Sequence, residues 1–464
     1  MLNLGLKKRA KHMRGKYILA EAKRKSLVRG LEAKTLNNFR SRENEPPQYK
    51  APIEQILDKE TWKSYGAVST PPEIVSFMLK LSGVKTWESL RILEPGAGLC
   101  EFLEKIYQNH PNNYFYGVEA NRDIYDIAHS LFPQFHLILE DFLLWKPEIE
   151  FDLVIGNPPY GIIGDQSHYP IHILKKKKEA YKAIFSTWYG KYNIYGAFIE
   201  KGINLLKNGG KLIFILPTTF MVLDEFKLLR KFLALSGKAI IYYLGPKIFQ
   251  GRTVATVILI CEKGSKGIEL FEVKNLKEII KCYERSDYEG GIIKFESNDS
   301  RTFEKGKIAL GEVFDIHFAA RSPEIKNHPK TSTRAGPGLV PALTGRNLHK
   351  GWIDYEKCFS GLYFPVSDAK LLRDFYGISH IVVGHTKAGK VVSAIDQKCY
   401  PWREELHLVP KSRELDLEKV AEYLNSEPVQ EYMKNLYKEI TPHLTMTQLK
   451  LLPIPFSFAK GGLL

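Results

Sequence analysis

The sequence lacks any long apolar run. Across its 464 residues no stretch approaches the roughly 18 consecutive apolar residues that a membrane-spanning helix needs. The first residues also lack the apolar stretch of a secretory signal peptide, because Lys and Arg are scattered through them. We therefore expect a cytoplasmic protein that makes no membrane contact.

Cysteine is scarce, and its spacing is uninformative for metal binding. The five cysteines form no CxxC pair; they are Cys100, Cys261, Cys282, Cys358 and Cys399. This spacing argues against zinc fingers and against a disulfide framework, and it favours a reducing compartment. The histidines likewise show no metal-ligand spacing, so we expect no metal.

Positive charge is abundant, and most of it lies at the start of the chain. The formal net charge is +15, and residues 1–50 contain 14 Lys and Arg against 4 Glu, a local net charge of +10. We define residues 1–55 as the basic arm. Such an arm is typical either of a solubilising tail or of a segment that contacts nucleic acid, and charge alone does not decide between them.

Between residues 72 and 262, apolar segments typical of strands alternate with segments of helical periodicity. This alternation predicts a doubly wound, largely parallel α/β sheet within a first domain, residues 56–294. The last two strand segments, AIIYYLG and TVATVILICE, should form an antiparallel hairpin at the sheet edge, because their connection is too short for a crossover helix. Weaker periodicity from about residue 295 predicts a separate mixed α/β domain, residues 295–464.

A glycine-rich turn follows the first predicted strand in the segment LEPGAGLCEFL. Gly96 and Gly98 precede a helix, an arrangement that lets a ligand approach the backbone closely. The third glycine of a dinucleotide-binding fingerprint is absent, because Glu101 occupies its place. A tight strand-to-helix connection would have the same pattern, so the ligand class has to come from the neighbouring strands.

Acidic residues end three consecutive predicted strands: Glu94, Glu119 and Asp141. Glu119 lies 23 residues after Gly96, where a carboxylate can accept two hydrogen bonds from a ribose diol. Carboxylates would repel a phosphate, but they suit a nucleoside that carries an amino acid. The pattern therefore predicts S-adenosylmethionine as the cofactor.

The segment FDLVIGNPPYG, residues 151–161, ends an apolar strand at an asparagine, two prolines and a tyrosine. The side-chain carbonyl of Asn157 and the backbone carbonyl of Pro158 can both accept hydrogen bonds. Two acceptors that face one point suit the exocyclic amine of adenine, whose hydrogens they draw out of plane. Tyr160 offers a ring on which an adenine flipped out of the duplex can stack. A plain strand-ending turn is the other interpretation.

A second aromatic ring occurs in the loop PKIFQGR between the last two predicted strands. Phe249 is surrounded there by Lys, Gln, Gly and Arg, so we expect it to have no hydrophobic core to enter. We interpret Phe249 as the wall of the base pocket opposite Tyr160, with local packing inside the loop as the alternative.

The order of these motifs carries a family resemblance. STPPE, LEPGAG, GVEAN, EDFLLW, IGNPPYG and the helix YGAF occur in the order found in TaqI-type (gamma-class) adenine-N6 DNA methyltransferases, which the sequence resembles. The likeness continues through FAARSPE, GPGLVPALTGRNL, YPWREELHLVPK and TPHLT, and it covers roughly residues 60–455. It implies a Rossmann-like S-adenosylmethionine-dependent methyltransferase domain followed by a target-recognition domain. The basic arm has no counterpart.

The resemblance also implies roles for individual residues. Asn157, Pro158 and Tyr160 would orient the flipped adenine, with Phe249 packing against it. The residues that would line the cofactor site are Thr70, Glu94, Pro95, Gly96, Ala97, Gly98, Glu119, Asp141, Phe142, Asn157 and Phe198.

Double-stranded DNA is the expected partner, bound by a monomer. Arg321, Arg346 and Lys387 are candidates for phosphate or guanine contacts, and Arg252, in the loop after Phe249, is a candidate DNA contact. By resemblance, Pro442 in TPHLT would enter the gap that the flipped base leaves. The resemblance makes TCGA the leading target, methylated on adenine within a restriction-modification system.

Other functions share parts of this pattern. A protein glutamine-N5 methyltransferase of the same fold also carries NPPY, but it has little reason to carry a C-terminal domain of about 170 residues. A nuclease is another class, because Asp315, Glu324 and Lys326 loosely resemble a metal-dependent cleavage triad. A DNA-binding protein without catalysis would be expected to lose NPPY, and this sequence retains it.

Overall fold

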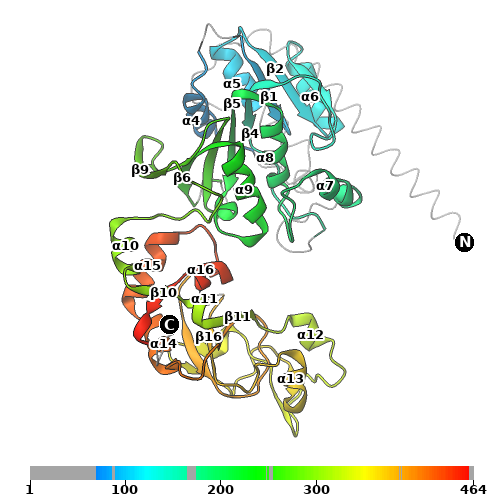
Figure 1. Ribbon diagram of the computed structural model, residues 1–464. Coiled ribbons are helices and arrows are strands. Elements are labelled where there is room, and N and C mark those ends of the chain that lie inside the picture. Colours follow the sequence, from blue (N-terminus) through cyan, green and yellow to red (C-terminus); the bar gives the residue numbers. More distant parts are fainter. Residues whose placement is uncertain are drawn as a thin grey trace, which may run out of the picture.

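The computed structural model of the protein describes residues 69–85, 89–164, 174–246, 248–249, 254–385, 387 and 389–458. The basic arm and Arg252 lie outside the described residues, so what was inferred for them stays a prediction. Figure 1 shows an N-terminal part built on a large sheet and a C-terminal part built on smaller sheets.

Within the described residues, the N-terminal part contains a mixed sheet of nine strands in the order β3-β2-β1-β4-β5-β7-β6-β8-β9. The strands are β1 (Arg91–Pro95), β2 (Tyr114–Glu119), β3 (His136–Leu139), β4 (Phe151–Gly156), β5 (Leu206–Pro217), β6 (Gly237–Gly245), β7 (Thr256–Lys263), β8 (Ile268–Lys274) and β9 (Glu278–Arg285). The strands β1 to β5 pair in parallel, so their carboxyl ends meet at one edge of the sheet. This confirms the predicted doubly wound arrangement.

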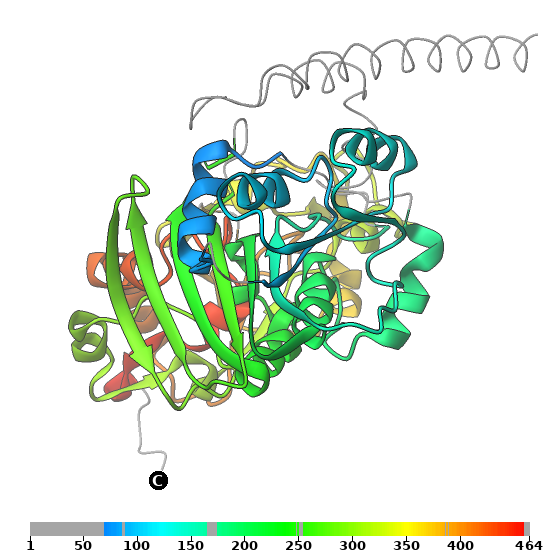
Figure 2. The same cartoon turned by 90° about the horizontal axis from the view of Figure 1, so that it is seen from above.

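Helices pack on both faces of this sheet, as Figures 1 and 2 show. The helices are α4 (Pro72–Ser82), α5 (Glu101–Asn109), α6 (Arg122–Leu131), α7 (Lys178–Ile184), α8 (Tyr195–Asn204) and α9 (Lys227–Ser236). Alternate residues of β5 divide between the two faces: Phe214 and Leu216 belong to the core with α8 and α9. Ile213 and Ile215 belong to the core with α4 and α5. The two-residue period of the strand therefore builds two separate cores.

The predicted hairpin forms as strands β6 and β7, but it does not lie at the sheet edge. β7 is inserted between β5 and β6, and β8 and β9 extend the sheet beyond β6. The reason lies in burial, because the first six residues of β7, Thr256–Cys261, are all buried, as expected of a strand covered on both faces. No residue of the edge strand β9 is buried. An edge position therefore suits β9, whereas at the edge the apolar side chains of β7 would be exposed to solvent.

The described C-terminal residues form a four-stranded antiparallel sheet, in the order β11-β18-β16-β17, and three two-stranded sheets. The strands are β10 (Lys307–Ala309), β11 (Phe314–Phe318), β12 (Leu339–Pro341), β13 (Leu348–His349), β14 (Trp352–Ile353), β15 (Tyr363–Pro365), β16 (His380–Val383), β17 (Ser393–Asp396), β18 (Leu406–Pro410) and β19 (Pro453–Pro455). The helices are α10 (Asn298–Glu304), α11 (Leu310–Val313), α12 (Ser322–Lys326), α13 (Ala369–Leu372), α14 (Leu417–Leu424), α15 (Glu427–Tyr437) and α16 (Met446–Lys450).

The two parts share a hydrophobic core, because the cluster on the α8 and α9 face continues into the C-terminal part. The chain that links them is bound on both sides. The Ile293 N–H donates to the Met221 carbonyl at 2.8 Å, and the Phe295 N–H donates to the Leu436 carbonyl at 2.8 Å. The boundary placed after residue 294 stays a prediction within this linking segment. No helix in the described ranges is long and apolar enough to cross a membrane.

Candidate active site

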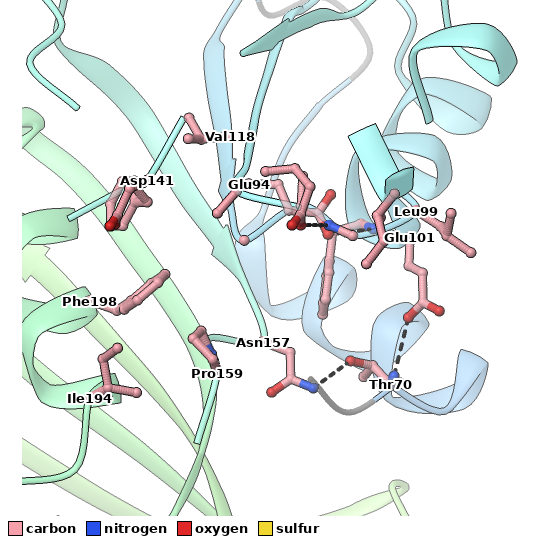
Figure 3. Close-up of a pocket in the computed structure, with 18 of the residues that line it drawn as sticks. Thr70, Glu94, Leu99, Glu101, Val118, Asp141, Asn157, Pro159, Ile194 and Phe198 are labelled. Carbon is pink, nitrogen blue, oxygen red and sulfur yellow. Dashed lines mark hydrogen bonds between the residues drawn. The ribbon is translucent and has the colours of Figure 1, made fainter. Parts of the chain in front are cut away.

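A pocket opens at the sheet edge where β1, β2 and β4 end, and Figure 3 shows it with its lining side chains. Doubly wound sheets bind ligands beyond the carboxyl ends of their strands. The pocket encloses about 1070 Å³, including the part open to solvent. The predicted cofactor residues that line it are Thr70, Glu94, Gly96, Ala97, Gly98, Glu119, Asp141, Phe142, Asn157 and Phe198. Pro95 is buried at the end of β1 and is not among the lining residues.

Sequence reasoning missed about half of the pocket wall. The additional lining residues are Ser69, Leu99, Glu101, Phe102, Val118, Ala120, Ile124, Leu143, Pro159, Leu174 and Ile194. Most of these are apolar and lie beside a predicted residue in the chain. Their periodicity does not distinguish them from ordinary core positions, so only the fold identifies them.

The glycine-rich turn has the backbone that the sequence predicted. Gly96 and Gly98 have φ angles of +65° and +54°, in the left-handed region that favours glycine. The Ala97 N–H donates to the Val118 carbonyl at 2.9 Å, which ties the turn to β2. A Cβ atom at Gly98 would meet no neighbour within 4 Å, so the backbone conformation, rather than crowding, favours glycine there. The turn leads directly into α5.

Two predicted acids hold the backbone around this turn. Glu94 accepts the Leu103 N–H of α5 at 3.0 Å, and Glu119 accepts the N–H groups of Gly98 at 2.9 Å and Asn121 at 2.7 Å. Burial raises the pKa of both carboxyl groups, and the backbone N–H donors oppose this rise. The Gly98 N–H therefore points at a carboxylate and is not directed at a phosphate.

Asp141 follows β3 and is bound on both of its oxygens. Its Oδ1 accepts the Leu143 N–H at 3.0 Å. Its Oδ2 accepts from the Lys177 amine at 2.7 Å and from the Tyr181 hydroxyl at 2.5 Å. Burial, followed by the hydrogen bond and charge of Asp141, raises the pKa of Tyr181, so this hydroxyl stays protonated and donates. Tyr181 lies in α7 and Lys177 directly precedes that helix, and no sequence pattern assigned a role to either residue.

Aromatic rings form an apolar wall beside Asp141. The ring centroids of Phe142 and Phe198 are 5.0 Å apart, with their planes at 36°. Lys201 lies near this wall, and its amine donates to the Leu143 carbonyl at 3.2 Å. Burial lowers the pKa of Lys201 to about 8. The two phenylalanines thus provide a flat apolar surface next to a fixed carboxylate.

The residues present fit S-adenosylmethionine. Three acidic side chains near strand ends give the pocket several oxygen acceptors, which suit a ligand with hydroxyl and amino donors. Glu119 and Asp141 each retain lone pairs beyond the hydrogen bonds described above, and Phe142 and Phe198 can flank an aromatic base. When bound, this cofactor supplies a methyl group on a positively charged sulfur.

Thr70 lies just before α4 and does not cap it. The N-cap position is Pro71, and the helix begins at Pro72, which has no N–H that needs an acceptor. Thr70 instead accepts a hydrogen bond from Asn157 Nδ2 at its Oγ1, over 3.0 Å. Its own N–H donates to Glu101 Oε2 at 3.2 Å, so the residue that replaces the third glycine anchors this contact.

The amide of Asn157 is held in one orientation. Figure 3 shows its nitrogen directed at Thr70 and its oxygen on the opposite side. The Tyr160 hydroxyl contacts this oxygen and also donates to the Ile215 carbonyl at 2.8 Å. An amide oxygen has two lone pairs and can accept more than one donor. Pro158 is buried beside it, and Pro159 lines the pocket.

Tyr160 and Phe249 come together, as the sequence suggested, but Phe249 is not exposed. Their ring centroids are 6.4 Å apart, with planes at 69°, so the rings meet edge to face. Phe249 is 8% exposed and belongs to the same hydrophobic cluster as Ile74 and Phe77 of α4. The expectation that it has no core to enter is wrong, because its ring packs into the hydrophobic cluster on the α4 face of the sheet.

The predicted DNA contacts differ in how exposed they are. Arg321, Arg346 and Pro442 are exposed, as DNA contacts must be. Lys387 is half-buried, and its amine donates to the carbonyls of Gly345 at 2.6 Å and Leu348 at 2.9 Å. Lys387 therefore stabilises the turn that carries Arg346, and its amine binds backbone carbonyls of the protein.

Two residues of the nuclease-like pattern lie close to basic side chains. Glu324 pairs with Arg373 at 3.1 Å, and Asp315 lies 3.8 Å from Lys411. In the part of the chain that the structure describes, no three His, Cys, Asp or Glu side chains gather as metal ligands.

The fold and the pocket together define the class of S-adenosylmethionine-dependent methyltransferases. Comparison with known families agrees. Residues 78–249 match the family of Eco57I restriction-modification methylases, and residues 340–454 match the TaqI-like C-terminal specificity domain. The chain is 48% identical over 396 residues to type II methyltransferase M.TthHB8I of Thermus thermophilus, spanning 84% of this chain and 91% of that protein.

More distant relatives agree with this result. Type II methyltransferase M.HincII of Haemophilus influenzae is 31% identical over 223 residues, which cover 47% of this chain and 41% of that protein. The solved structure of the type IIL restriction-modification enzyme MmeI in complex with DNA superimposes with a TM-score of 0.53, at 12% identity. It covers 86% of this chain and 69% of that chain, and it supports the fold alone. The protein belongs to the type II DNA methyltransferases of restriction-modification systems.

Proposed function

We propose that the protein is a TaqI-type adenine-N6 DNA methyltransferase that flips its target adenine out of the duplex. The observation that carries the proposal is the Asn157 amide, which lines the pocket and is held there by Thr70 at its nitrogen and by the Tyr160 hydroxyl at its oxygen. A hydrogen-bond acceptor fixed in this way beside a cofactor site can bind an exocyclic amine, and that amine would then receive the methyl group.

The roles of the chain's own residues follow from this arrangement. Asn157 Oδ1 and the Pro158 carbonyl would accept the two hydrogens of the target amine and favour a tetrahedral nitrogen. Tyr160 serves twice in the proposal: its hydroxyl steadies Asn157, and its ring offers a stacking surface for the base. Phe249 would form the second aromatic surface after a small movement, because the two rings now meet edge to face.

The macromolecular substrate is proposed to be double-stranded DNA, read by a monomer in the cytoplasm. Membership of the type II methyltransferases favours DNA over a protein glutamine, and the C-terminal match is to a specificity domain. Exposed Arg321, Arg346 and Pro442 would contact the duplex. By resemblance to the TaqI-type enzymes, the proposed target is TCGA.

The test is methylation of defined duplexes with an isotopically labelled methyl donor, followed by mass analysis of the nucleosides. We expect N6-methyladenine, formed in duplexes that contain TCGA and not in duplexes with one base of this site changed. Label in cytosine would contradict the adenine assignment. Label in adenine outside TCGA would support adenine methylation but contradict TCGA as the target sequence.

A further inference from the structure

The carboxyl end of β5 contacts the NPPY segment on one side and the C-terminal part on the other. The Ile215 carbonyl accepts from the Tyr160 hydroxyl at 2.8 Å. Thr218 follows three residues later, at the start of the 3-10 helix η2 (Thr218–Met221), and is fully buried. Its hydroxyl donates to the Ile440 carbonyl at 2.7 Å, a contact between residues 222 positions apart, and lies farther, at 3.2 Å, from the Ala255 carbonyl.

Ile440 precedes a short exposed loop that is held at both ends. We call residues 441–443 the pinned loop. At its far end, the Leu444 N–H donates to the His385 carbonyl at 3.2 Å, and His385 Nδ1 is 2.6 Å from the Leu444 carbonyl. Pro442 and His443 are exposed between the two ends. The pinned loop thus has one anchor on the catalytic sheet and another on the C-terminal part.

Other contacts join the two parts on the same side. The Lys438 amine lies 2.7 Å from Glu272 Oε1 on β8, and the Thr447 hydroxyl donates to Asp224 Oδ1 at 2.8 Å. Thr447 lies in α16, and Asp224 begins the 3-10 helix η3 (Asp224–Phe226), which directly precedes α9; Figure 1 labels α9 and α16. These contacts are between side chains, whereas Thr218 binds the backbone where the pinned loop begins. Thr218 therefore has the most direct effect on the place of the loop.

We propose that Thr218 is a positioning residue for methyl transfer, which fixes the pinned loop relative to the NPPY segment. The inference rests on the proposed function, because it assumes that Pro442 enters the duplex as the base leaves. The distance between the pinned loop, which enters the duplex, and Tyr160, which captures the base, is then fixed. Without the hydroxyl, the buried Ile440 carbonyl loses this donor, and the start of the loop can shift away from the sheet. A small shift at this point would uncouple the two events.

The experiment compares Thr218→Val with Thr218→Ser on two duplexes. In one duplex the target adenine is paired with thymine, and in the other it faces an abasic site, where no pairing has to be broken. We expect Thr218→Val to lower the single-turnover methylation rate about tenfold on the paired duplex and much less on the abasic duplex. Thr218→Ser retains the donor and should restore the rate. Cofactor affinity should stay unchanged in both variants.

The outcomes separate the alternatives. An equal loss on both duplexes, or no loss on either, would overturn the positioning role. Wild-type protein that puts no methyl group on adenine, or that gains nothing from the abasic site, would overturn the proposed function and this inference together. Thr447→Val is the matched control, because it removes a hydroxyl donor from the contacts between the two parts without touching the pinned loop. If Thr218→Val does not fold, Glu272→Gln should show the same preference for the abasic duplex in weaker form, because it weakens the contact to Lys438, two residues before Ile440.

Discussion

The pocket at the sheet edge and the C-terminal part hold their functional residues in different ways. Around the pocket, each polar side chain has a defined partner: Thr70 binds Asn157, Glu119 binds the glycine turn, and Tyr181 binds Asp141. In the C-terminal part, Arg321 and Arg346 extend from the surface, and Lys387 is used to hold a turn.

This difference reflects the two tasks. Transfer of a methyl group requires atoms fixed to within fractions of an ångström, so the pocket is built from strand ends and buried hydrogen bonds. Contacts to phosphates tolerate motion, because charge acts over several ångströms and the partner brings its own geometry. Substitutions near the pocket should therefore affect the chemical step, whereas those in the C-terminal part should affect binding and its salt dependence.

The largest effect is expected from Asn157→Ala. It removes an acceptor used mainly in the transition state, so the single-turnover rate should fall by about two orders of magnitude or more. The affinity for DNA, measured by titration, should stay near that of the wild type. Thr70→Val keeps the Asn157 side chain but removes the hydroxyl that accepts from its amide nitrogen, so the single-turnover rate should fall less. A near-normal rate for Asn157→Ala would remove the central group from the proposed mechanism.

The next effect concerns the aromatic rings. Tyr160→Ala and Phe249→Ala should each weaken capture of the extrahelical base by about 1 to 3 kcal/mol, the cost of losing a stacking surface. Tyr160→Phe should keep base capture but lower the rate, because its hydroxyl contacts Asn157 and Ile215. A fluorescent adenine analogue at the target position reports capture. Unchanged fluorescence in both alanine variants would argue against the pocket.

A smaller effect is expected from Tyr181→Phe. Loss of the hydroxyl leaves Asp141 with Lys177 as its remaining partner at Oδ2, so cofactor affinity should fall about three- to tenfold. Calorimetric titration with the cofactor measures this change. Tyr192→Phe is the control, because Tyr192 is a buried tyrosine that bonds Thr187 and does not touch Asp141. Equal losses in the two variants would assign the effect to packing.

Sequence patterns identified the site where it depends on local structure. Strand ends, the positive φ angles of Gly96 and Gly98, and the NPPY turn follow from short-range patterns, and the structure brings them to one pocket. The contacts that fix them did not follow, because Thr70 and Asn157 are 87 residues apart and Asp141 and Tyr181 are 40 apart. Burial of Phe249 and the interior place of β7 likewise depend on how segments pack.

Within the C-terminal part, Arg346 and Lys387 allow an exposed cation to be compared with one that is bound inside the protein. Each phosphate contact contributes about 0.9 to the slope of log affinity against log salt, so Arg346→Ala should lower the slope by about one. Lys387→Met should change the slope less, because its amine is held by the Gly345 and Leu348 carbonyls, but it should lower thermal stability. Binding titrations over a range of salt concentrations, with thermal melts, measure both. Equal slope changes would show that Lys387 also reaches phosphate.

The smallest effect on chemistry is expected from removing residues 1–50. With a net charge of +10, this segment should be attracted to any polyanion, and such contacts carry no sequence information. Deletion should therefore leave the target site and the single-turnover rate nearly unchanged, while it weakens DNA binding at low salt and flattens the salt dependence. A solubilising tail predicts equal slopes for the two proteins instead. Titrations of full-length and shortened protein across salt concentrations decide between these alternatives, because a slope counts neutralised phosphates whatever the absolute affinity.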